Sequence, residues 1–335
     1  MKIAVDAMGG DFAPGVVVSG ALEACREYKQ PVILVGDEAA IHNELNGYSG
    51  TDLLEIVHAP EVISNNESPA VAVRRKKNSS IVRSVSLVKE GEAAALVSAG
   101  STGGVMAAAL LGLGRIKGID RPAIVSIIPS LKGGTVLLDV GANVDCKPYQ
   151  LVQFAIMGSL YAEKVMGISF PRVALLSNGE EDTKGNELTL AAYPLLKMTE
   201  LNFIGNAEGR DIFNGTVDVM VCDGFVGNVV LKTGEGLASA LIEMVKEEVN
   251  KNMLAKLGAL IAVPALKNFR RRLDYAEYGG APLLGVNGIA IICHGSSSAR
   301  AIKNAIRTAR EAAENNLIGS IRDSVQDGPR REVGS

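Results

Sequence analysis

The stretch KIAVDAMGGD at residues 2–11 shows the pattern that decides the fold: a strand-like run, Lys2–Asp6, followed by a polar turn with two glycines. Such runs, bounded by Gly, Pro, Asp or Asn, recur along the chain, and continuous apolar runs are typical of strands buried on both faces of a sheet. They are Ile3–Asp6, Val32–Gly36, Ala94–Ser98, Ile124–Ile128, Val136–Val140, Val173–Ser177, Val217–Cys222 and Ile289–Cys293.

Segments with helical spacing separate several of these runs, among them Met106–Leu113, Leu151–Met166 and Glu235–Val249. Strands that alternate with helices predict an α/β fold, a mainly parallel sheet with helices on both faces. We expect one large unit over residues 1–320, either undivided or built as two lobes around a cleft, and a polar, frayed tail over residues 321–335.

Composition excludes few classes of protein. The formal net charge of −3 gives no general attraction to nucleic acid or membranes, so any such contact needs a local patch. The four cysteines are far apart and predict neither a disulfide framework nor a zinc site, which fits a reducing cytoplasm. The N-terminus lacks the charged and apolar regions of a signal peptide, and no apolar run reaches the roughly 20 residues of a membrane span.

Several catalytic motifs are absent from the sequence. There is no G-K-[ST] phosphate loop, no H-E-x-x-H metal motif and no G-x-S-x-G nucleophile elbow. The nearest dinucleotide fingerprint, Gly234–Ser239, ends in Ser and lacks the preceding strand. We therefore expect no nucleotide cofactor and no metal.

Five polar turns follow strand-like runs, and ligands of open α/β sheets bind beyond the carboxyl ends of strands. Asp6–Asp11 allows close backbone approach, although an ordinary strand-to-helix turn with an N-cap is the favoured interpretation when this turn is taken alone. Ser98–Gly104 precedes a helix, whose free N–H groups attract inorganic phosphate or a phosphopantetheine phosphate; the alternative is a plain capped helix.

The other three turns carry amide, carboxylate and ammonium groups. Asp139–Asp145 is expected to position ligands by hydrogen bonds, and Asn178–Glu187 holds Lys184 among acidic side chains, as an anion ligand or in surface salt bridges. In Asp223–Asn228, Asn228 either donates to an oxyanion or caps a helix. The candidate substrate-binding residues of all five turns are Asp6, Gly9, Gly10, Asp11, Ser98, Gly100, Ser101, Thr102, Gly103, Asp139, Asn143, Glu181, Asp223, Gly224, Phe225 and Gly227.

Two further residues have nucleophilic or basic side chains. Cys146 lies beside the third turn and could hold an acyl group, but no feature pairs it with a histidine, so a small buried residue is the favoured interpretation. His294 precedes Gly295-Ser296-Ser297-Ser298 at a strand end, where a structural role is favoured over lining a site.

Taken together, these turns resemble the PlsX family, the phosphate acyltransferases of bacterial phospholipid synthesis. The resemblance covers nearly the whole chain and rests on the order of eight segments, although Ser101 stands where Asn is common in the family. The segments are AVDAMGGD (4–11), RRKKNSS (74–80), GRIKGIDRPA (114–123), LLDVGANVD (137–145), KGNE (184–187), DGFVGNVVLK (223–232), YGGAPLLGVNG (278–288) and HGSS (294–297).

The resemblance implies a fold akin to isocitrate and isopropylmalate dehydrogenases and phosphotransacetylase. It also implies a homodimer, acyl carrier protein as acyl donor, inorganic phosphate as acceptor, and catalytic roles for Lys184 and Asn228. Formation of the expected product, an acyl phosphate, is the first step toward phosphatidic acid. The alternatives are a phosphotransacetylase-like enzyme that uses acyl-coenzyme A, a decarboxylating dehydrogenase and a non-enzymatic membrane scaffold.

Two surface segments suggest partners. The basic run Arg74–Lys77 is a candidate docking site for the acidic carrier protein, or else a solvated helix face. Residues 253–273 are expected to form a protruding amphipathic helical segment, broken at Pro264, that touches the inner face of the cell membrane, where a glycerol-3-phosphate acyltransferase would take the product. A dimer interface or a lid over the acyl chain are the alternatives. The expected membrane contacts are Leu254, Leu257, Leu260, Ile261 and Val263, with cations at Lys256, Lys267 and Arg270–Arg272.

Overall fold

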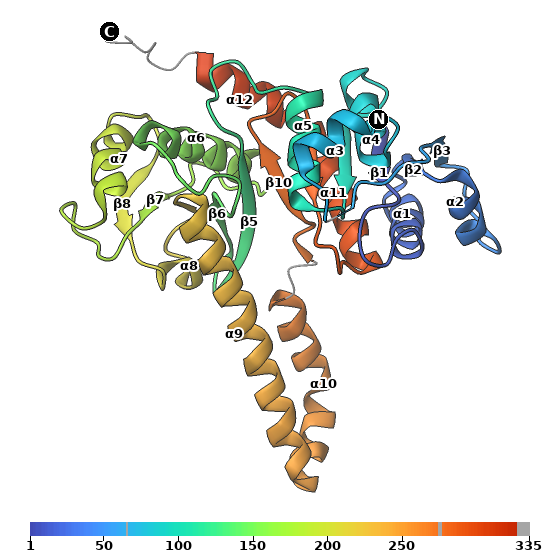
Figure 1. Cartoon of the computed structure of the whole chain (residues 1–335). Coiled ribbons are helices and arrows are strands. Elements are labelled where there is room, and N and C mark those ends of the chain that lie inside the picture. Colours follow the sequence, from blue (N-terminus) through green and yellow to red (C-terminus); the bar gives the residue numbers. More distant parts are fainter. Residues whose placement is uncertain (65, 274–276, 327–335) are drawn as a thin grey trace.

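The eleven strands that the computed structural model describes form one sheet (Figure 1). The description covers residues 1–64, 66–273 and 277–326, and for residues 265–273 the backbone alone. The strands are β1 (Ile3–Asp6), β2 (Val32–Gly36), β3 (Leu54–His58), β4 (Ala95–Ser98), β5 (Ala123–Ser130), β6 (Gly133–Leu138), β7 (Val173–Leu176), β8 (Phe203–Ala207), β9 (Val219–Val221), β10 (Ala281–Leu284) and β11 (Ile289–Ile292).

Helices connect most of these strands and cover both faces of the sheet, as the alternating sequence pattern predicted. They are α1 (Gly15–Tyr28), α2 (Glu38–Leu45), α3 (Pro69–Arg75), α4 (Ser80–Lys89), α5 (Thr102–Gly112), α6 (Pro148–Lys164), α7 (Glu187–Lys197), α8 (Asp211–Asn214), α9 (Gly224–Lys251), α10 (Met253–Leu273), α11 (Ala299–Glu314) and α12 (Leu317–Gln326).

The direction of the strands reverses across the middle of the sheet, whose order is β3-β2-β1-β4-β11-β10-β5-β6-β9-β7-β8. The strands β1, β4 and β11 are parallel, whereas β10 is antiparallel to both β11 and β5, and β5 is antiparallel to β6. The strands β9 and β7 then run parallel to β6. The carboxyl ends of β1, β4 and β11 therefore lie at one edge of the sheet, and those of β6, β7 and β9 lie at the opposite edge.

Alternate residues of each strand supply the two sides of the core, because successive side chains point to opposite faces. In β4, Ala95 and Val97 join a cluster with α1, α6, α7, α11 and α12, whereas Leu96 packs in a second cluster with α4, α5, α8 and the start of α9. The apolar stripe of α11, Ile302, Ala305, Ile306 and Ala309, has the helical spacing that seals the first face.

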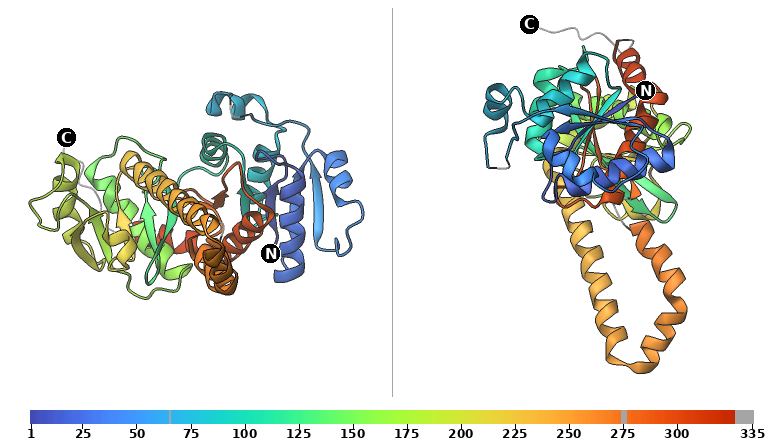
Figure 2. Two further views of the ribbon diagram at one scale, coloured as in Figure 1. Left: turned by 90° about the horizontal axis from the view of Figure 1, so that it is seen from below. Right: turned by 90° about the vertical axis from the view of Figure 1, so that its right-hand side faces the viewer.

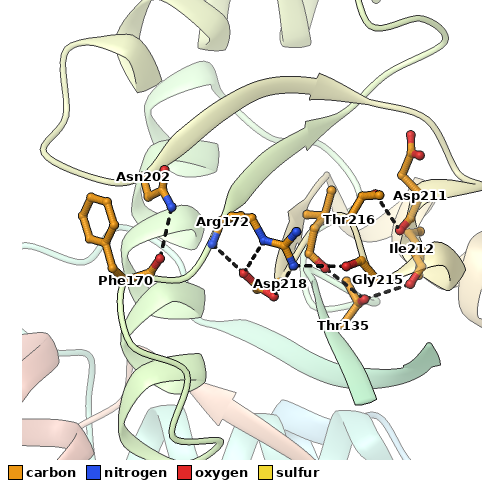
Figure 3. A network of polar contacts seen from close by, with 10 residues as sticks. Thr135, Phe170, Arg172, Asn202, Asp211, Ile212, Gly215, Thr216 and Asp218 are labelled. Carbon is orange, nitrogen blue, oxygen red and sulfur yellow. Dashed lines mark hydrogen bonds and ion pairs between the residues drawn. The ribbon is translucent and has the colours of Figure 1, made fainter. Parts of the chain in front are cut away.

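A polar network fixes the half of the sheet that contains β6 to β9 (Figure 3). Arg172, just before β7, donates from Nε and Nη2 to the carboxylate of Asp218, just before β9, each at 2.9 Å. Burial raises the pKa of Asp218, but the hydrogen bonds from Arg172 lower it by more. The pKa of Asp218 therefore lies below its ordinary value. Thr135 Oγ1 of β6 bonds the carbonyls of Ile212 and Val217 at 2.8 and 3.2 Å, which ties α8 to the same corner.

The helices α9 and α10 form a hairpin that projects from the α/β body (Figures 1 and 2). The α9 helix begins at Gly224, well before the predicted start at Glu235, and packs against β5 and β6 before it leaves the body. The expectation that Pro264 breaks the segment is wrong, because α10 continues through it. Proline removes one hydrogen bond to the carbonyl four residues earlier, that of Leu260, and water can solvate this carbonyl on a projecting helix.

The prediction that the chain is frayed from residue 321 is also wrong for its first residues. Residues 321–326 complete α12, where Ile321 is fully buried and Val325 packs against the core. The spacing of Leu317, Ile321 and Val325 places all three on one helix face, which explains the order. The remaining tail, residues 327–335, lies outside the described residues.

Candidate functional site

A cavity of about 340 Å³ opens at the edge of the sheet where β1, β4 and β11 end. It brings the first two predicted turns together, from Met8 to Asp11 and from Ala99 to Thr102, and it adds residues that lie elsewhere in the sequence. Its lining comprises Met8, Gly9, Gly10, Asp11, Val62, Ile63, Ser64, Ala99, Gly100, Ser101, Thr102, Cys293, His294 and Gly295.

The buried carboxyl group of Asp6 lines a smaller pocket that shares Gly9, Gly100 and Ser101 with this cavity. Its Oδ2 accepts a hydrogen bond from Ser98 Oγ at 2.7 Å, and Ser98 Oγ in turn accepts one from the Gly100 amide at 3.0 Å. Burial raises the pKa of Asp6, while hydrogen bonds from Ser80 and Ser98 oppose that rise. A Cβ on Gly9 would lie 2.7 Å from both Asp6 Oδ2 and the Gly100 amide, so only glycine lets the two turns pack this closely.

The helix α5 begins at the cavity, and Ser101 caps it by accepting a hydrogen bond from the Gly104 amide at 3.1 Å. The capped-helix interpretation of this turn is therefore correct, and it leaves the first N–H groups of α5 at the lining residue Thr102. By contrast, Asp6 and Asp11 cap no helix: α1 begins after Pro14 without a side-chain cap, and Asp6 accepts a hydrogen bond from the Met8 amide instead.

His294 lies in the cavity lining rather than in the core. Its Nδ1 is 2.8 Å from Ser296 Oγ and accepts a hydrogen bond from the Ser296 amide at 3.3 Å. The Asp11 amide donates to the carbonyl of Gly295 at 2.8 Å, which joins this loop to the first turn. Sequence reasoning favoured a structural role for His294 and did not select Val62, Ile63 or Ser64, which follow no Gly-rich strand end.

At the opposite edge of the sheet, Asp139 holds the third turn. Its buried carboxylate accepts hydrogen bonds from the amides of Ile124, Gly141, Ala142 and Asn143 and from Asn143 Nδ2, at 2.7 to 3.3 Å. Burial raises the pKa of Asp139, and the N–H donors of Ala142 and Ile124 oppose that rise. Asp139 and Asn143 are thus engaged in hydrogen bonds within the protein that hold this turn, and their role as substrate ligands stays a prediction.

The start of α9 is locked onto this turn, and it presents Asn228. The Gly224 amide donates to the Asn143 carbonyl at 2.7 Å, and a Cβ on Gly227 would lie only 1.9 Å from the Asp139 carbonyl oxygen. The alternative that Asn228 is the N-cap is wrong, because Asp223 caps α9 by accepting from the Val226 amide at 2.9 Å. Asn228 is exposed on the first turns of α9, near Gly141.

The fourth turn holds Lys184 at the same edge, after β7. The Lys184 amide donates to the Glu181 carbonyl at 3.1 Å, Asn206 Nδ2 donates to that carbonyl at 2.7 Å, and Asn186 caps α7. The surface salt bridges of this region join Arg210 to Glu180 and Glu208. The exposed ammonium of Lys184 has no hydrogen bond or ion pair with any residue that the structure describes.

Within one chain, the predicted site residues therefore form two separate groups. The residues near Asp6, Ser101 and His294 lie at the edge formed by β1, β4 and β11, and those near Asp139, Lys184 and Asn228 lie at the opposite edge. Reversal of strand direction through β10, β5 and β6 causes the separation, since carboxyl ends meet only in parallel strands.

Comparison with known proteins identifies the family of this chain. Over residues 1–320 the chain matches the family described as "Fatty acid synthesis protein". It is 68% identical over 326 residues to a phosphate acyltransferase of Pelotomaculum thermopropionicum, which covers 97% of this chain and 95% of that protein. It is 62% identical over 327 residues to a phosphate acyltransferase of Heliobacterium modesticaldum, at 97% and 98% coverage.

The chain belongs to this family. The resemblance to PlsX phosphate acyltransferases is thus confirmed, and the protein is an acyltransferase enzyme. The EutD phosphotransacetylase of Staphylococcus aureus aligns with a TM-score of 0.64 at 17% identity, over 93% of this chain and 94% of that chain. A phosphotransacetylase of Streptococcus pyogenes aligns with a TM-score of 0.63 at 21% identity, over 94% of each chain. These likenesses confirm the predicted fold.

Within this acyltransferase, the environment of Cys146 opposes its use as a nucleophile. The thiol is half-buried and donates to the Asn143 carbonyl at 3.6 Å. Burial, followed by the charge of Asp139, raises the pKa of Cys146 to about 12. A thiol at this pKa stays protonated at neutral pH, whereas the nucleophile of covalent acyl transfer is the thiolate.

Its projecting hairpin exposes large apolar side chains at the tip. Leu254 and Ile261 are 78% and 79% exposed, Leu257 and Leu260 are also exposed, and Val263 is partly buried. Among the residues that the structure describes, no helix is long and apolar enough to cross a membrane. The side chains of Lys267 and Arg270–Arg272 lie outside the described part of the chain.

Proposed function

We propose that this enzyme transfers a fatty acyl group from acyl carrier protein to inorganic phosphate, giving an acyl phosphate as the first step toward phosphatidic acid. The relatives' name, phosphate acyltransferase, supports phosphate as the acceptor, and the family description supports a fatty acyl group. In the reaction a phosphate oxygen attacks the thioester carbonyl, a C–O bond forms, the C–S bond breaks and the carrier thiolate leaves.

The state of Lys184 and Asn228 is the observation that carries the proposal. Their backbones are fixed by the loop of Asn206 and Glu181 and by the Asp139 turn, yet both side chains are exposed and unbonded among the described residues. Donors held ready for a charge that develops only during reaction are the usual means of stabilising an oxyanion. Phosphate is itself the nucleophile, so neither a catalytic triad nor a nucleotide cofactor is required.

The cavity lined by Ala99–Thr102 is a proposed site for a phosphate group, either inorganic phosphate or the phosphopantetheine phosphate of the donor. The start of α5 brings free N–H groups and the positive end of a helix dipole to a lining rich in hydroxyl groups. The candidate substrate contacts there are Asp11, Ser101 and Thr102, with Gly10, Gly100 and Gly103 as close-approach positions. At the other edge, Phe225 and Glu181 are exposed beside the catalytic pair.

The proposal includes where the enzyme works. We place it in the cytoplasm as a homodimer, bound peripherally to the inner face of the cell membrane by the exposed apolar tip of the hairpin. Acyl phosphates are amphiphiles, so a membrane-bound glycerol-3-phosphate acyltransferase is the expected acceptor of the product.

Incubation of the protein with palmitoyl-acyl carrier protein and phosphate tests the proposal, with hydroxylamine trapping of acyl phosphate as the readout. A parallel reaction with palmitoyl-coenzyme A tests the phosphotransacetylase-like alternative, and Lys184→Ala serves as the background control. We expect acyl phosphate from the carrier-protein donor and about background with coenzyme A. Equal or greater turnover of the coenzyme A thioester would overturn the assignment of the donor.

A further inference from the structure

We infer that Asp11 makes the cavity selective for a phosphate that carries a proton, so that it binds inorganic phosphate and rejects both sulfate and the phosphopantetheine diester of the acyl donor. This inference rests on the proposed function for phosphate as the acyl acceptor, and it names the form of phosphate that the cavity takes. Its structural basis is one carboxylate held among neutral hydrogen-bond donors.

Asp11 is held at the cavity by its backbone, and its side chain lies against the loop after β11. Its amide donates to the Gly295 carbonyl at 2.8 Å. A Cβ on Gly10, whose φ is +109°, would lie 3.1 Å from both that carbonyl oxygen and Ala99 Cβ, so glycine lets the turn approach the ends of β4 and β11. A Cβ on Gly295 would lie 3.1 and 3.2 Å from the two carboxylate oxygens of Asp11. The carboxylate therefore borders the cavity, where it has no hydrogen bond or ion pair with any residue that the structure describes.

The start of α5 supplies neutral donors across the cavity lining. The first N–H groups of this helix, at the lining residue Thr102, have no acceptor within the helix. Ser101 Oγ accepts from the Gly104 amide at 3.1 Å, so the hydroxyl proton of Ser101 remains able to donate to a ligand. These groups attract an anion through partial charges and carry no full positive charge.

His294 adds a donor of the same neutral kind. The Ser296 amide, 3.3 Å from His294 Nδ1, can only donate, so Nδ1 is the accepting nitrogen and the proton of the neutral ring lies on Nε2. The described lining contains no Lys or Arg, and Asp11 is the one carboxylate in it. Neutral donors beside a single charged acceptor are therefore the chemistry that a ligand of this cavity meets.

A carboxylate beside an anion site selects for a proton on the ligand. An ionised carboxylate accepts hydrogen bonds and cannot donate them, so a bare anionic oxygen beside Asp11 would meet like charge, with no cation in the described lining to offset it. At neutral pH inorganic phosphate carries at least one O–H group, whereas sulfate and a phosphodiester carry none. Asp11 rejects these two ligands through an unpaired charge. It accepts the protonated oxygen of phosphate, which leaves an unprotonated oxygen to attack the thioester carbonyl.

Equilibrium dialysis with radiolabelled inorganic phosphate tests the inference without catalysis, and unlabelled arsenate, sulfate and dimethyl phosphate serve as competitors. Arsenate carries a proton at neutral pH and should displace phosphate at a similar concentration. Sulfate and the diester should require at least about 10²-fold higher concentrations, because each places a bare charge beside Asp11. In Asp11→Asn the side-chain amide can donate to a bare oxygen, so the preference for phosphate over sulfate should fall by about 10²-fold.

Asp52→Asn is the matched control. Asp52 is exposed just before β3, which runs parallel to β2 and β1, so this variant loses the same charge at the edge of the sheet opposite the cavity. It should keep the wild-type preference for phosphate. Both variants should unfold near the wild-type temperature, because the Asp11 amide, and not its side chain, bonds Gly295.

Steady-state kinetics separates the two sources of phosphate. In Asp11→Asn, sulfate should become a competitive inhibitor against inorganic phosphate, and the Michaelis constant for palmitoyl-acyl carrier protein should stay within about twofold of the wild-type value. Sulfate that competes with the carrier protein instead would show that the cavity holds the phosphopantetheine diester, which contradicts the inference.

The dialysis result also separates this inference from the proposed function. Equal displacement by sulfate and arsenate in the wild type overturns the inference even if acyl phosphate forms, and so does an unchanged preference in Asp11→Asn. Absence of acyl phosphate from a protein that binds phosphate with the expected preference contradicts only the proposed function.

Discussion

Lys184 and Asn228 are positioned by the backbone around them, and neither side chain bonds any residue that the structure describes, which makes them sensitive test positions. Lys184→Ala and Asn228→Ala should each lower turnover by about 10²- to 10³-fold, because each removes a donor that we propose acts mainly in the transition state. Thermal unfolding should remain near that of the wild type, since neither side chain supports the fold. Steady-state kinetics with palmitoyl-acyl carrier protein measures the loss.

Lys232→Ala is the control for this pair. Lys232 lies one turn after Asn228 on α9 and, among the residues that the structure describes, pairs with Glu235 alone at the surface, so its loss should change turnover little. If Lys184→Ala and Asn228→Ala both retain turnover like that of Lys232→Ala, the catalytic assignment is wrong.

The Cys146 thiol gives a pH-dependent prediction. Because its pKa is raised from 9.0 to about 12, deprotonation requires alkaline solution, and the thiol is protonated throughout the range from pH 6 to 9. Cys146→Ser should therefore retain turnover within about threefold and show the same pH–rate profile as the wild type in that range. A wild-type rate that rises between pH 7 and 9 and is flat in Cys146→Ser would restore the thiolate as a nucleophile.

Among single residues, the sequence identified those whose chemical role can be inferred from their immediate neighbours in the chain. Ser101 and Lys184 lie in polar, Gly-rich turns after apolar runs, and such turns can be recognised without a structure. Val62–Ser64, which line the cavity, and Ser80, which lines the smaller pocket with Asp6, could not be found in this way, because they come from segments that show no strand-end pattern. The burial of Asn143 and its hydrogen bond to the Pro122 carbonyl likewise depend on contact with another segment of the chain.

The α9 helix links the Asp139 turn to Asn228, and two glycines on it allow a matched test of that link. A Cβ at position 227 would lie 1.9 Å from the Asp139 carbonyl, whereas one at Gly236 would meet nothing within 4 Å. Gly227→Ala should displace the start of α9, destabilise the fold by about 1–3 kcal/mol and lower turnover through Asn228 by roughly 10²-fold.

Gly236→Ala should instead stabilise the fold by about 0.5–1 kcal/mol and leave turnover unchanged, because alanine favours the helix at an exposed interior position. Denaturant unfolding and kinetics on the same preparations separate the two effects. Equal behaviour of the two variants would mean that the contact between α9 and the Asp139 turn does not position Asn228.

The hairpin tip gives the membrane prediction. Leu257→Glu/Ile261→Glu should abolish sedimentation with phosphatidylglycerol vesicles, because it replaces two exposed apolar side chains by charges that the headgroups repel. Turnover on acyl carrier protein should be unchanged. Asn250→Glu/Asn252→Asp adds the same charge near the tip, removes no apolar group and keeps the Asn252 cap of Leu254, so it should retain most binding.

Vesicle binding by the double glutamate variant at physiological salt would exclude insertion of the tip. Loss of the dimer or of folding in that variant would instead make the hairpin a structural interface. Equal loss of binding in both variants would show that net charge, rather than apolar contact, determines attachment.

The sequence predicted which segments form helices and strands, but not always where each helix or strand begins and ends. The start of α9 was placed too late because Gly224, Gly227, Gly234 and Gly236 weaken helix propensity, and tertiary contacts with the Asp139 turn override it. Pro264 was expected to end a helix, yet the backbone of α10 passes through it. Both errors arise because local helix propensity predicts helix boundaries poorly where tertiary contacts or water satisfy the hydrogen-bonding groups of the backbone.

For the whole molecule, the alternation of strands and helices was enough to predict a mainly parallel α/β sheet. It was not enough to predict which edge each turn occupies. That depends on two antiparallel pairings of β10, which leave β5 parallel to β11, and on the antiparallel pairing of β5 with β6, which reverses the direction. The pairings of β10 join residues far apart in the chain, such as Leu283 with Ile124. The five polar turns therefore divide between two edges, and only the assembled sheet shows this.

The overall charge of −3 makes attraction to an acidic carrier protein depend on a local patch. The run Arg74–Lys77 lies at the end of α3, beside the loop that lines the cavity, but its members are not equivalent. Lys76 Nζ donates to the Val62 carbonyl at 2.8 Å and to Glu67 at 2.6 Å. The hydrogen bond from Lys76 lowers the pKa of Glu67 to about 2, so this pair stays charged and supports the loop across the neutral range.

Arg74 and Lys77 are exposed and have no described partner, so they are the better candidates for docking than Arg75 and Lys76. Arg74→Glu/Lys77→Glu should raise the Michaelis constant for palmitoyl-acyl carrier protein about tenfold at low salt, with little change in the turnover number. The effect should shrink as salt rises, since exposed charges are screened over about 10 Å at 0.1 M.

Lys89→Glu/Lys117→Glu is the matched control, because it changes the net charge equally at exposed positions and Lys89 lies at the end of α4 farthest from the cavity residue Ser80. If both double variants raise the Michaelis constant alike, long-range attraction to the whole protein is sufficient and no patch is needed. If Arg74→Glu/Lys77→Glu has no effect at low salt, the carrier protein docks elsewhere, and the cavity entrance beside α3 is not its route to the phosphate.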